Sequence, residues 1–177
     1  MQNLDAITIA SKVLLYVFVI MAVAMDMYCM RISNRLILAG LVSSFLLRIG
    51  QGGWSELFPY LGNILFPVIT LYLLYLSGGL GAGDIKLFSI IGGFTNFICL
   101  AQCMIAAFVI GGAFAAAKMI CRRNVRKHTY RIFDYLISIM SGKYRPFERI
   151  EGKDGNLIHF ALAIFLGLCL VRVHPLW

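Results

Sequence analysis

The sequence predicts an all-α integral membrane protein with six transmembrane helices, an N-terminus outside and a basic loop on the cytoplasmic side. Of its 177 residues, 60% are hydrophobic and only 14% are charged, and the mean hydropathy is +0.85. Soluble domains are nearer half apolar and a quarter charged, so this chain has too few polar side chains to cover a soluble core. The same composition excludes a disordered chain, collagen, a coiled coil and a disulfide scaffold.

Four apolar segments are each predicted to cross the membrane once, a crossing that takes about 20 residues. They lie at residues 8–26, 36–50, 57–76 and 157–173. The glycine-rich stretch 77–83 ends the third of them. Arg48, near the end of the short second segment, is expected to extend toward the membrane surface.

Residues 87–117 form an uninterrupted run without a charged side chain. A single helix over these 31 residues would be about 46 Å long, whereas the hydrocarbon core of a bilayer is about 30 Å thick. Gly92-Gly93 and Thr95-Asn96 offer places for a break. We therefore predict two short spans, 84–95 and 97–118, joined near Asn96.

The distribution of basic residues favours six spans over five. Most of the 16 Lys and Arg residues then fall on the cytoplasmic side, and only Lys12, Arg48 and Arg172 fall outside. A single helix over 87–117 would move the basic loop 119–156 outside, although cytoplasmic loops are the ones enriched in Lys and Arg. The inner residues are Arg31, Arg35, Lys86, Lys118, Arg122, Arg123, Arg126, Lys127, Arg131, Lys143, Arg145, Arg149 and Lys153.

The basic loop contains one further helical pattern. Phe133, Leu136, Ile137, Met140 and Tyr144 recur at helical spacing, which predicts a helix on the cytoplasmic interface. A small soluble helical hairpin is the alternative. Contact between the 121–155 segment and anionic lipid is expected. Nucleic-acid binding is not, because no recognised binding motif accompanies the charge.

Only two acidic residues, Asp26 and Asp84, fall within or at the edge of the predicted spans. Acidic side chains are costly in a membrane, so each is a candidate functional residue. The predicted topology places Asp26 at the cytoplasmic end of the first span and Asp84 at the cytoplasmic start of the fourth. The two therefore lie at the same depth, where the two helices can bring them together.

Two carboxylates in contact do not easily both ionise, and they share a proton near neutral pH. Such a pair can hydrolyse a peptide bond: the ionised group takes a proton from the attacking water, and the protonated group supports the oxyanion. No cofactor is required, and no metal-site or serine-protease motif is present. The alternative is structural, with each Asp capping a helix or pairing with an Arg.

Glycines surround Asp84. Gly79, Gly81 and Gly83 expose backbone without Cβ atoms, which allows a substrate strand to approach closely. The alternative is a flexible turn that ends the third span. Lys86 lies about 200° around a helix from Asp84, so we expect it at the interface rather than paired with that carboxylate.

Two motifs together resemble those of the type IV prepilin peptidases and the related archaeal preflagellin peptidases, which are intramembrane aspartic proteases of the GxGD type. Residues 81–87 (GAGDIKL) resemble the family motif G-x-G-D-x-K-L. Residues 26–34 (DMYCMRISN) resemble its first motif, an Asp followed by a basic residue and Ile-Pro-Asn, with Ser33 where the family usually has Pro. The resemblance implies that Asp26 and Asp84 are the catalytic pair. The motif residues expected to shape the site are Gly81, Gly83, Lys86, Arg31 and Asn34.

The resemblance also implies a substrate and a location. The expected substrate is a prepilin-like protein with a short basic leader and a hydrophobic helix, cleaved at the cytoplasmic boundary of the inner membrane of a prokaryote. The cysteine-bearing N-terminal domain of the methylating members is missing, so the chain is similar to the short, peptidase-only form that serves tight-adherence pili. Two alternatives remain open: a small carrier or channel with the two Asp residues as a proton relay, and a non-catalytic pilus-assembly scaffold.

Overall fold

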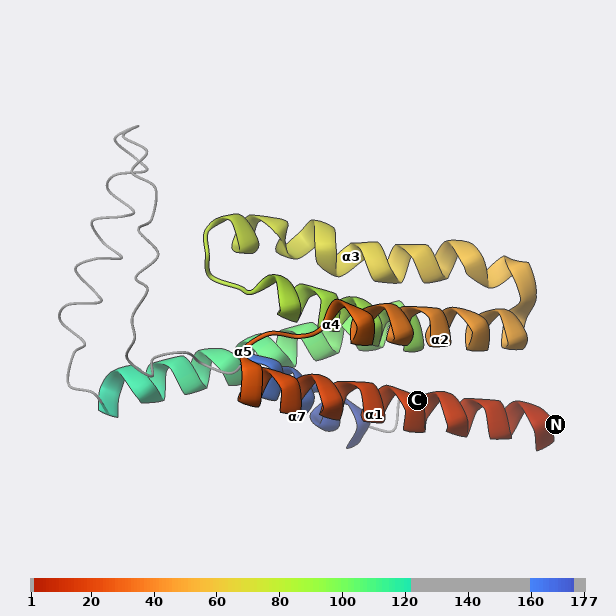
Figure 1. The fold of residues 1–177 in the computed structure, drawn as a ribbon, viewed down its shortest axis with the longest axis horizontal. Helices are drawn as coiled ribbons and strands as arrows, with labels where there is room; N and C mark the ends of the chain where they lie inside the picture. Colours follow the sequence, from red (N-terminus) through yellow and green to blue (C-terminus); the bar gives the residue numbers. More distant parts are fainter. Residues whose placement is uncertain (1, 122–159, 174–177) are drawn as a thin grey trace.

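The computed structural model describes residues 2–121 and 160–173, and in these residues every regular element is a helix. The helices lie side by side in an elongated bundle (Figure 1). This confirms the predicted all-α fold for the described residues. Most of the basic loop, with its predicted interfacial helix, lies outside them. The elements are α1 (Gln2–Cys29), α2 (Asn34–Gly52), the 3₁₀ helix η1 (Gly53–Glu56), α3 (Leu57–Leu76), α4 (Ala82–Phe94), α5 (Phe97–Cys121) and α7 (Phe160–Val173).

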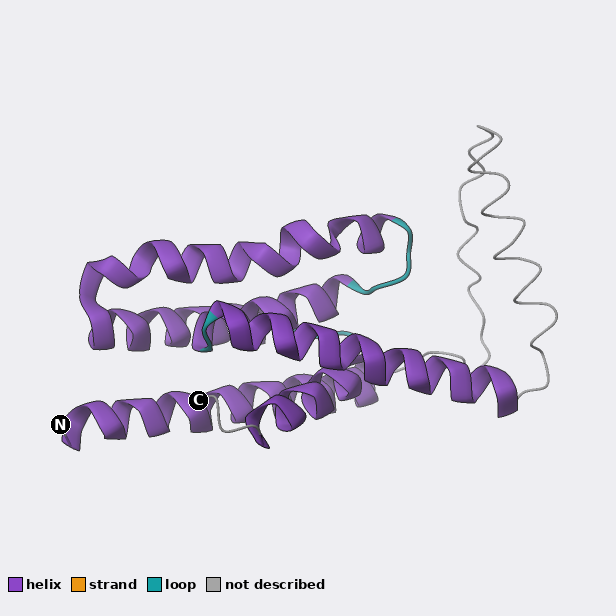
Figure 2. Cartoon of the chain, turned by 180° about the vertical axis from the view of Figure 1, so that it is seen from behind, coloured by secondary structure: helices purple, strands orange, loops and turns teal. Residues whose placement is uncertain are grey.

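Three helical stretches are long and apolar enough to cross a membrane: Ile7–Cys29, Asn34–Leu76 and Phe97–Ala117. The middle stretch contains both α2 and α3, which fold back on each other through η1 (Figure 2). The 13 residues of α4 span only about 20 Å, less than the thickness of the hydrocarbon core. Crossing by all six predicted segments stays a prediction.

The break in the long apolar run falls at Thr95 and Asn96. Thr95 is extended, with φ −120° and ψ 169°, and the Asn96 side chain accepts a hydrogen bond from the Cys99 N–H at 2.9 Å. Asn96 thus caps the N-terminus of α5, a position that Asn favours. Gly92 and Gly93, the other proposed break, are instead part of α4.

These two glycines are where α4 packs most closely against its neighbours. A Cβ atom at Gly92 would overlap the backbone carbonyl of Asn63 in α3, and one at Gly93 would lie 2.5 Å from the Ser44 hydroxyl in α2. Small residues at helix contacts let backbones approach closely, which is a main source of helix association in membranes. The pair therefore sets the spacing of α2, α3 and α4.

The core of the described bundle is built around α4. Its residues Leu87, Phe88, Ile90 and Ile91 are fully buried, and α1, α2, α3, α5 and α7 all contact it. A helix that is apolar on every side belongs in the centre of a bundle. Because α4 begins at the glycine-rich loop, this packing also fixes where Asp84 lies.

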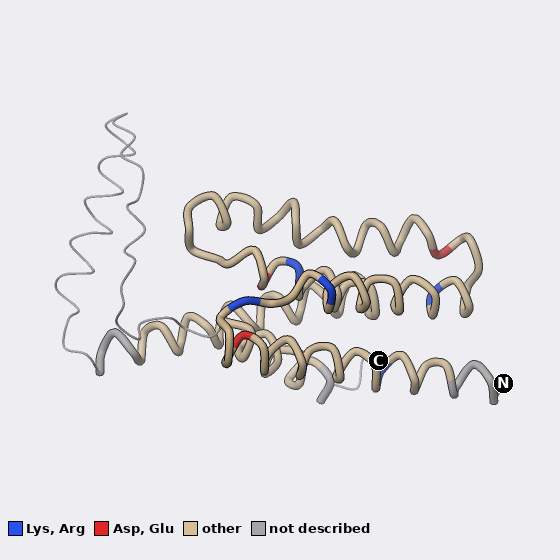
Figure 3. The backbone as a smooth tube through the Cα atoms, viewed as in Figure 1, with Lys and Arg blue, Asp and Glu red and all other residues tan. Residues whose placement is uncertain are grey.

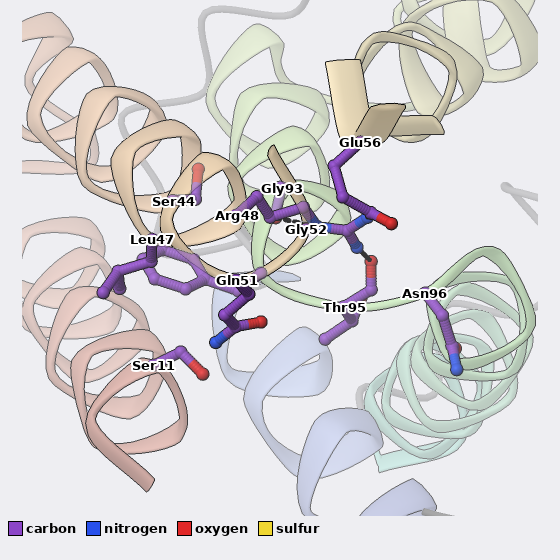
Figure 4. Close-up of a pocket in the computed structure, with 11 residues that line it drawn as sticks. Ser11, Ser44, Leu47, Arg48, Gln51, Gly52, Glu56, Gly93, Thr95 and Asn96 are labelled. Atoms are coloured by element: carbon purple, nitrogen blue, oxygen red, sulfur yellow. Dashed lines mark hydrogen bonds and ion pairs between the residues drawn. The ribbon is translucent and has the colours of Figure 1, made fainter. Parts of the chain in front are cut away.

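The C-terminal end of α4 is held by a polar network around Arg48 (Figure 4). The Arg48 guanidinium donates hydrogen bonds to the carbonyls of Gly93 (3.2 Å) and Thr95, and pairs with Glu56 at 3.2 Å. Its side chain is only 17% exposed, because these partners cover it. Its extension toward the membrane surface stays a prediction. Carbonyls at a helix end lack partners within the helix, and Arg48 supplies them. A cavity of about 280 Å³ borders this network.

Candidate active site

The helices that carry the two acidic residues, α1 and α4, lie against each other. Phe18 of α1 and Phe94 of α4 are in ring contact, with centroids 6.1 Å apart. From that contact, Asp26 is eight residues further along α1 and Asp84 is ten residues back along α4, which correspond to about 12 and 15 Å of helix. The antiparallel packing therefore places both acids at nearly the same level.

Asp26 is half-buried in the last turn of α1, just before the chain turns toward α2. The carbonyl of Asp26 accepts a hydrogen bond from the Met30 N–H at 3.0 Å, and Met30 has a left-handed backbone with φ 52°. A left-handed residue is a common way to end a helix. This turn ends α1 one helical turn beyond the carboxylate and leads directly into the segment 31–34.

Asp84 is half-buried in the first turn of α4, and its carboxylate also caps that helix. The carboxylate accepts a hydrogen bond from the Gly81 N–H at 3.3 Å, while the Asp84 N–H donates to the Gly81 carbonyl at 3.1 Å. The N-cap position that the sequence offers to Asp84 as a structural alternative is occupied by Gly81, and Asp84 caps the helix from its third position. Capping employs one carboxylate oxygen and holds the side chain in place.

Gly81 has a steric role beside this carboxylate. A Cβ atom at position 81 would lie 3.1 Å from the nearer oxygen of Asp84, which is tighter than ordinary van der Waals contact. The glycine leaves that side of the carboxylate open. The close approach of a substrate strand, which the glycines around Asp84 suggest in the sequence, stays a prediction.

The two carboxyl groups are close enough for the charge of Asp26 to act on Asp84. Neither group is fully exposed to water, so their interaction is screened less than one between surface charges. The two carboxyl groups therefore influence each other across the contact between α1 and α4.

The segments around the two acids also contact each other directly. The Lys86 ammonium in α4 donates a hydrogen bond to the side-chain oxygen of Asn34 at 2.9 Å. Gly83 packs against the side chain of Ile32. A Cβ atom added at Gly83 would lie 3.4 Å from the nearest side-chain carbon of Ile32. Residues 32–34 and the exposed part of 81–86 therefore form one surface where α1 ends and α2 and α4 begin, the ends that lie close together in Figure 3.

Not every predicted site residue joins this surface in the same way. Arg31 is exposed beside it. Ile32 was not predicted as a site residue, yet it is the contact of Gly83. The sequence could have indicated Ile32 only through its position between Arg31 and Asn34 in the first motif. The type of an aliphatic residue does not reveal which residue it contacts.

A family comparison covers this part of the chain. Residues 13–116 match the Type IV leader peptidase family. The chain belongs to this family. The matched range makes up more than half of the sequence and includes Asp26, Asp84 and both motifs. No curated protein and no solved structure matches this chain.

Family membership and the apolar helices agree in identifying a membrane protease. The family implies that the peptidase acts on prepilin-like substrates. Its long apolar helices have the length and composition of membrane spans. The resemblance seen in the two motifs is confirmed by the family match.

Proposed function

We propose that the peptidase is an intramembrane aspartic endopeptidase that removes the short basic leader of type IV prepilin-like substrates, with Asp26 and Asp84 as its catalytic pair. The observation that carries the proposal is that these two half-buried carboxyl groups lie on helices in contact, at nearly the same level and within electrostatic range of each other. The family match supports the reaction class, and the bundle supports the pairing of the two residues.

The proposed mechanism uses the two groups in different protonation states. The ionised carboxylate takes a proton from a water molecule as its oxygen attacks the carbonyl of the scissile peptide. The protonated carboxyl donates a hydrogen bond to the oxygen on which negative charge develops. The C–N bond of the tetrahedral intermediate then breaks, and the leaving amine receives the proton that the first carboxylate took from water, which restores the starting state of the pair. Water is the only other reactant.

The residues around the pair have supporting parts in this proposal. Gly81 leaves the Asp84 carboxylate accessible, and its N–H holds one of the carboxylate oxygens. The hydrogen bond between Lys86 and Asn34 holds the start of α4 against the start of α2. These contacts fix the carboxylates before a substrate arrives, so that little reorganisation is needed during the reaction.

Single substitutions test the pair. Asp26→Asn and Asp84→Asn keep the size of each side chain and remove its acid, and each is expected to lower the cleavage rate by at least about 100-fold, as the loss of an acid–base group does. The assay is co-expression with candidate prepilins from the same genome, with leader removal measured by mass spectrometry. Glu56→Gln is the matched control, because Glu56 belongs to the Arg48 network at the other end of α4.

The same variants separate the peptidase from its alternatives. A scaffold would tolerate both Asn substitutions. A carrier would show proton-coupled flux in proteoliposomes and cleave no prepilin. Cleavage at the wild-type rate by either Asn variant, in protein that is still found in the membrane, would refute the catalytic pair.

A further inference from the structure

A lateral groove opens between α2, α3 and α4. Its volume is about 300 Å³, and its walls are the apolar side chains Ile37, Leu38, Leu41, Ile64 and Val68. Leu38 is 64% exposed and Val68 is 39% exposed, so the groove opens to the side of the bundle. In a membrane this is the side that faces lipid chains.

One end of the lateral groove is polar, and its interior is not. Lys86 and Asn34 lie at that end, and the remaining polar lining residue, Ser89, donates its hydroxyl to the carbonyls of Ile64 (3.0 Å) and Ile85 (3.2 Å). Because the hydroxyl of Ser89 is engaged by backbone, the groove beyond Lys86 offers apolar contacts. A polar end followed by an apolar channel matches a molecule with a polar head and a hydrocarbon chain.

The charge at the polar end selects an anionic head group. Lys86 is the one charged residue among those that line the groove, and an ammonium has three protons, of which Asn34 takes one. The salt bridge found in the described part of the chain joins Arg48 and Glu56, so no carboxylate there forms an ion pair with Lys86. Two donor positions on Lys86 remain for a phosphate.

The neighbouring charges allow an anion at this position. Arg31 and Arg35 are exposed next to Asn34, at the start of α2. With Lys86 they outnumber the two carboxylates of the proposed catalytic pair. The N-terminus of a helix also carries a partial positive charge, which favours an anion near Asn34.

We propose that the lateral groove binds an anionic phospholipid, with one acyl chain between α2 and α3 and the phosphate bound by Lys86. The apolar part of this site lies away from the two aspartates, whereas its polar end shares Lys86 and Asn34 with the surface around them. Lipid binding does not depend on the proposed chemistry. The bound lipid covers the gap between α2 and α3 where α4 forms the floor. Basic pockets between membrane helices are known to take anionic head groups in this way.

Native mass spectrometry of the full-length protein tests the head-group contact, with dioleoyl phosphatidylglycerol and dioleoyl phosphatidylcholine as probes. Lys86→Gln is expected to weaken phosphatidylglycerol binding about fivefold, which corresponds to about 1 kcal/mol for one basic residue near an anionic surface. Lys86→Arg keeps the charge and should retain binding. Lys12→Gln, the same change on α1 away from the groove, should leave binding unchanged. Equal phosphatidylglycerol binding by Lys86→Gln and Lys12→Gln would overturn the proposal.

A second pair of variants tests the acyl chain. Val68→Trp places a large ring in the groove, whereas Val42→Trp places it on an exposed face of α2 outside the groove. Both positions are exposed, so both variants should fold. Loss of bound phosphatidylglycerol in Val68→Trp alone supports the proposal, and equal binding by the two variants contradicts it. A photo-crosslinker at Leu38 that captures a co-expressed prepilin, but no lipid, would assign the groove to the substrate and also overturn the proposal.

Discussion

The side chain of Asp84 combines a structural and a proposed chemical role. Its carboxylate accepts the Gly81 N–H and so helps to begin α4, and it also lies within the electrostatic range of Asp26. A carboxylate has two oxygens and about four acceptor positions, so one hydrogen bond does not exhaust it. Capping therefore positions the group, and the two interpretations offered by the sequence are compatible.

Ser33 departs from the family motif, and its backbone explains why this departure is tolerated. Ser33 has φ −66° and ψ 133°, which are angles that a proline ring adopts. Its hydroxyl accepts a hydrogen bond from the Arg35 N–H at 3.3 Å and so caps α2. A proline at this position would lose the capping hydroxyl. It would also lower the conformational entropy of the unfolded chain, which favours folding.

The substitution Ser33→Pro is therefore expected to leave stability nearly unchanged. Loss of an N-cap costs about 0.5–2 kcal/mol, and a proline at compatible angles returns about 0.4–1 kcal/mol. Ser33→Ala loses the cap without that return, so it should unfold at the lower temperature of the two. Thermal unfolding in detergent measures the difference. A Ser33→Pro variant less stable than Ser33→Ala would show that the loop cannot accept the ring.

Individual site residues differ in how far the sequence reveals them. Asp26 and Asp84 are visible because an acid in an apolar segment is costly and needs a reason. Arg48 is also visible, but its position near the end of a span fits both extension to the surface and a hydrogen bond to a helix end. The hydrogen bonds appear only in the fold, where the packing of α4 against α2 brings Arg48 to the carbonyls of Gly93 and Thr95.

Helix boundaries also divide into those that the sequence predicts and those that depend on packing between helices. Asn96 marks a boundary because its side chain accepts a hydrogen bond from the Cys99 N–H, only three residues away. Such short-range capping can be predicted from the sequence. Gly92 and Gly93 mark a close approach between helices, which depends on Asn63 and Ser44 in other elements. Glycine lowers helix propensity in either case, so the residue type alone does not separate a break from a contact.

The role of Gly92 predicts that adding one methyl group there disrupts the bundle. In Gly92→Ala the new Cβ meets the backbone carbonyl of Asn63, which cannot move aside as a flexible side chain would. Overpacking of this kind costs about 1–3 kcal/mol. We expect a lower unfolding temperature in detergent than for the parent protein.

Gly62→Ala is the matched control for that substitution. Gly62 lies in α3, and a Cβ at this position would meet no atom within 4 Å. Alanine there should be neutral or stabilising by up to about 1 kcal/mol, because it is the better helix former. If both variants unfold at the same temperature, α4 and α3 do not pack as closely as the structure has them.

The composition alone determines the class of the whole molecule, since so few charged residues leave no soluble alternative. How the helices pair is a different matter: the predicted topology makes α1 and α4 antiparallel, but no local pattern shows that these two helices contact each other. The apolar segments and the distribution of basic residues are enough to predict both acids at one end. The contacts between the motifs, through Ile32 and Asn34, required the fold.

The proposed orientation predicts which surface each end of α3 reaches. The 20 residues of α3 span about 30 Å, which matches the hydrocarbon core, so Ser55 and Ser77 should emerge on opposite sides. The two serines are a matched pair, because both are exposed and each donates its hydroxyl to the carbonyl three residues earlier. From the distribution of basic residues we expect the Ser77 end, with Asp84, in the cytoplasm.

Cysteine labelling of the full chain measures this orientation. In a background with the five native cysteines replaced, an impermeant maleimide on intact cells should label Ser55→Cys, and should label Ser77→Cys only after lysis. Labelling of both residues in intact cells would mean that α3 does not cross the membrane. The reverse pattern would place Asp26 and Asp84 outside, at a surface where a leader that stays in the cytoplasm could not reach them.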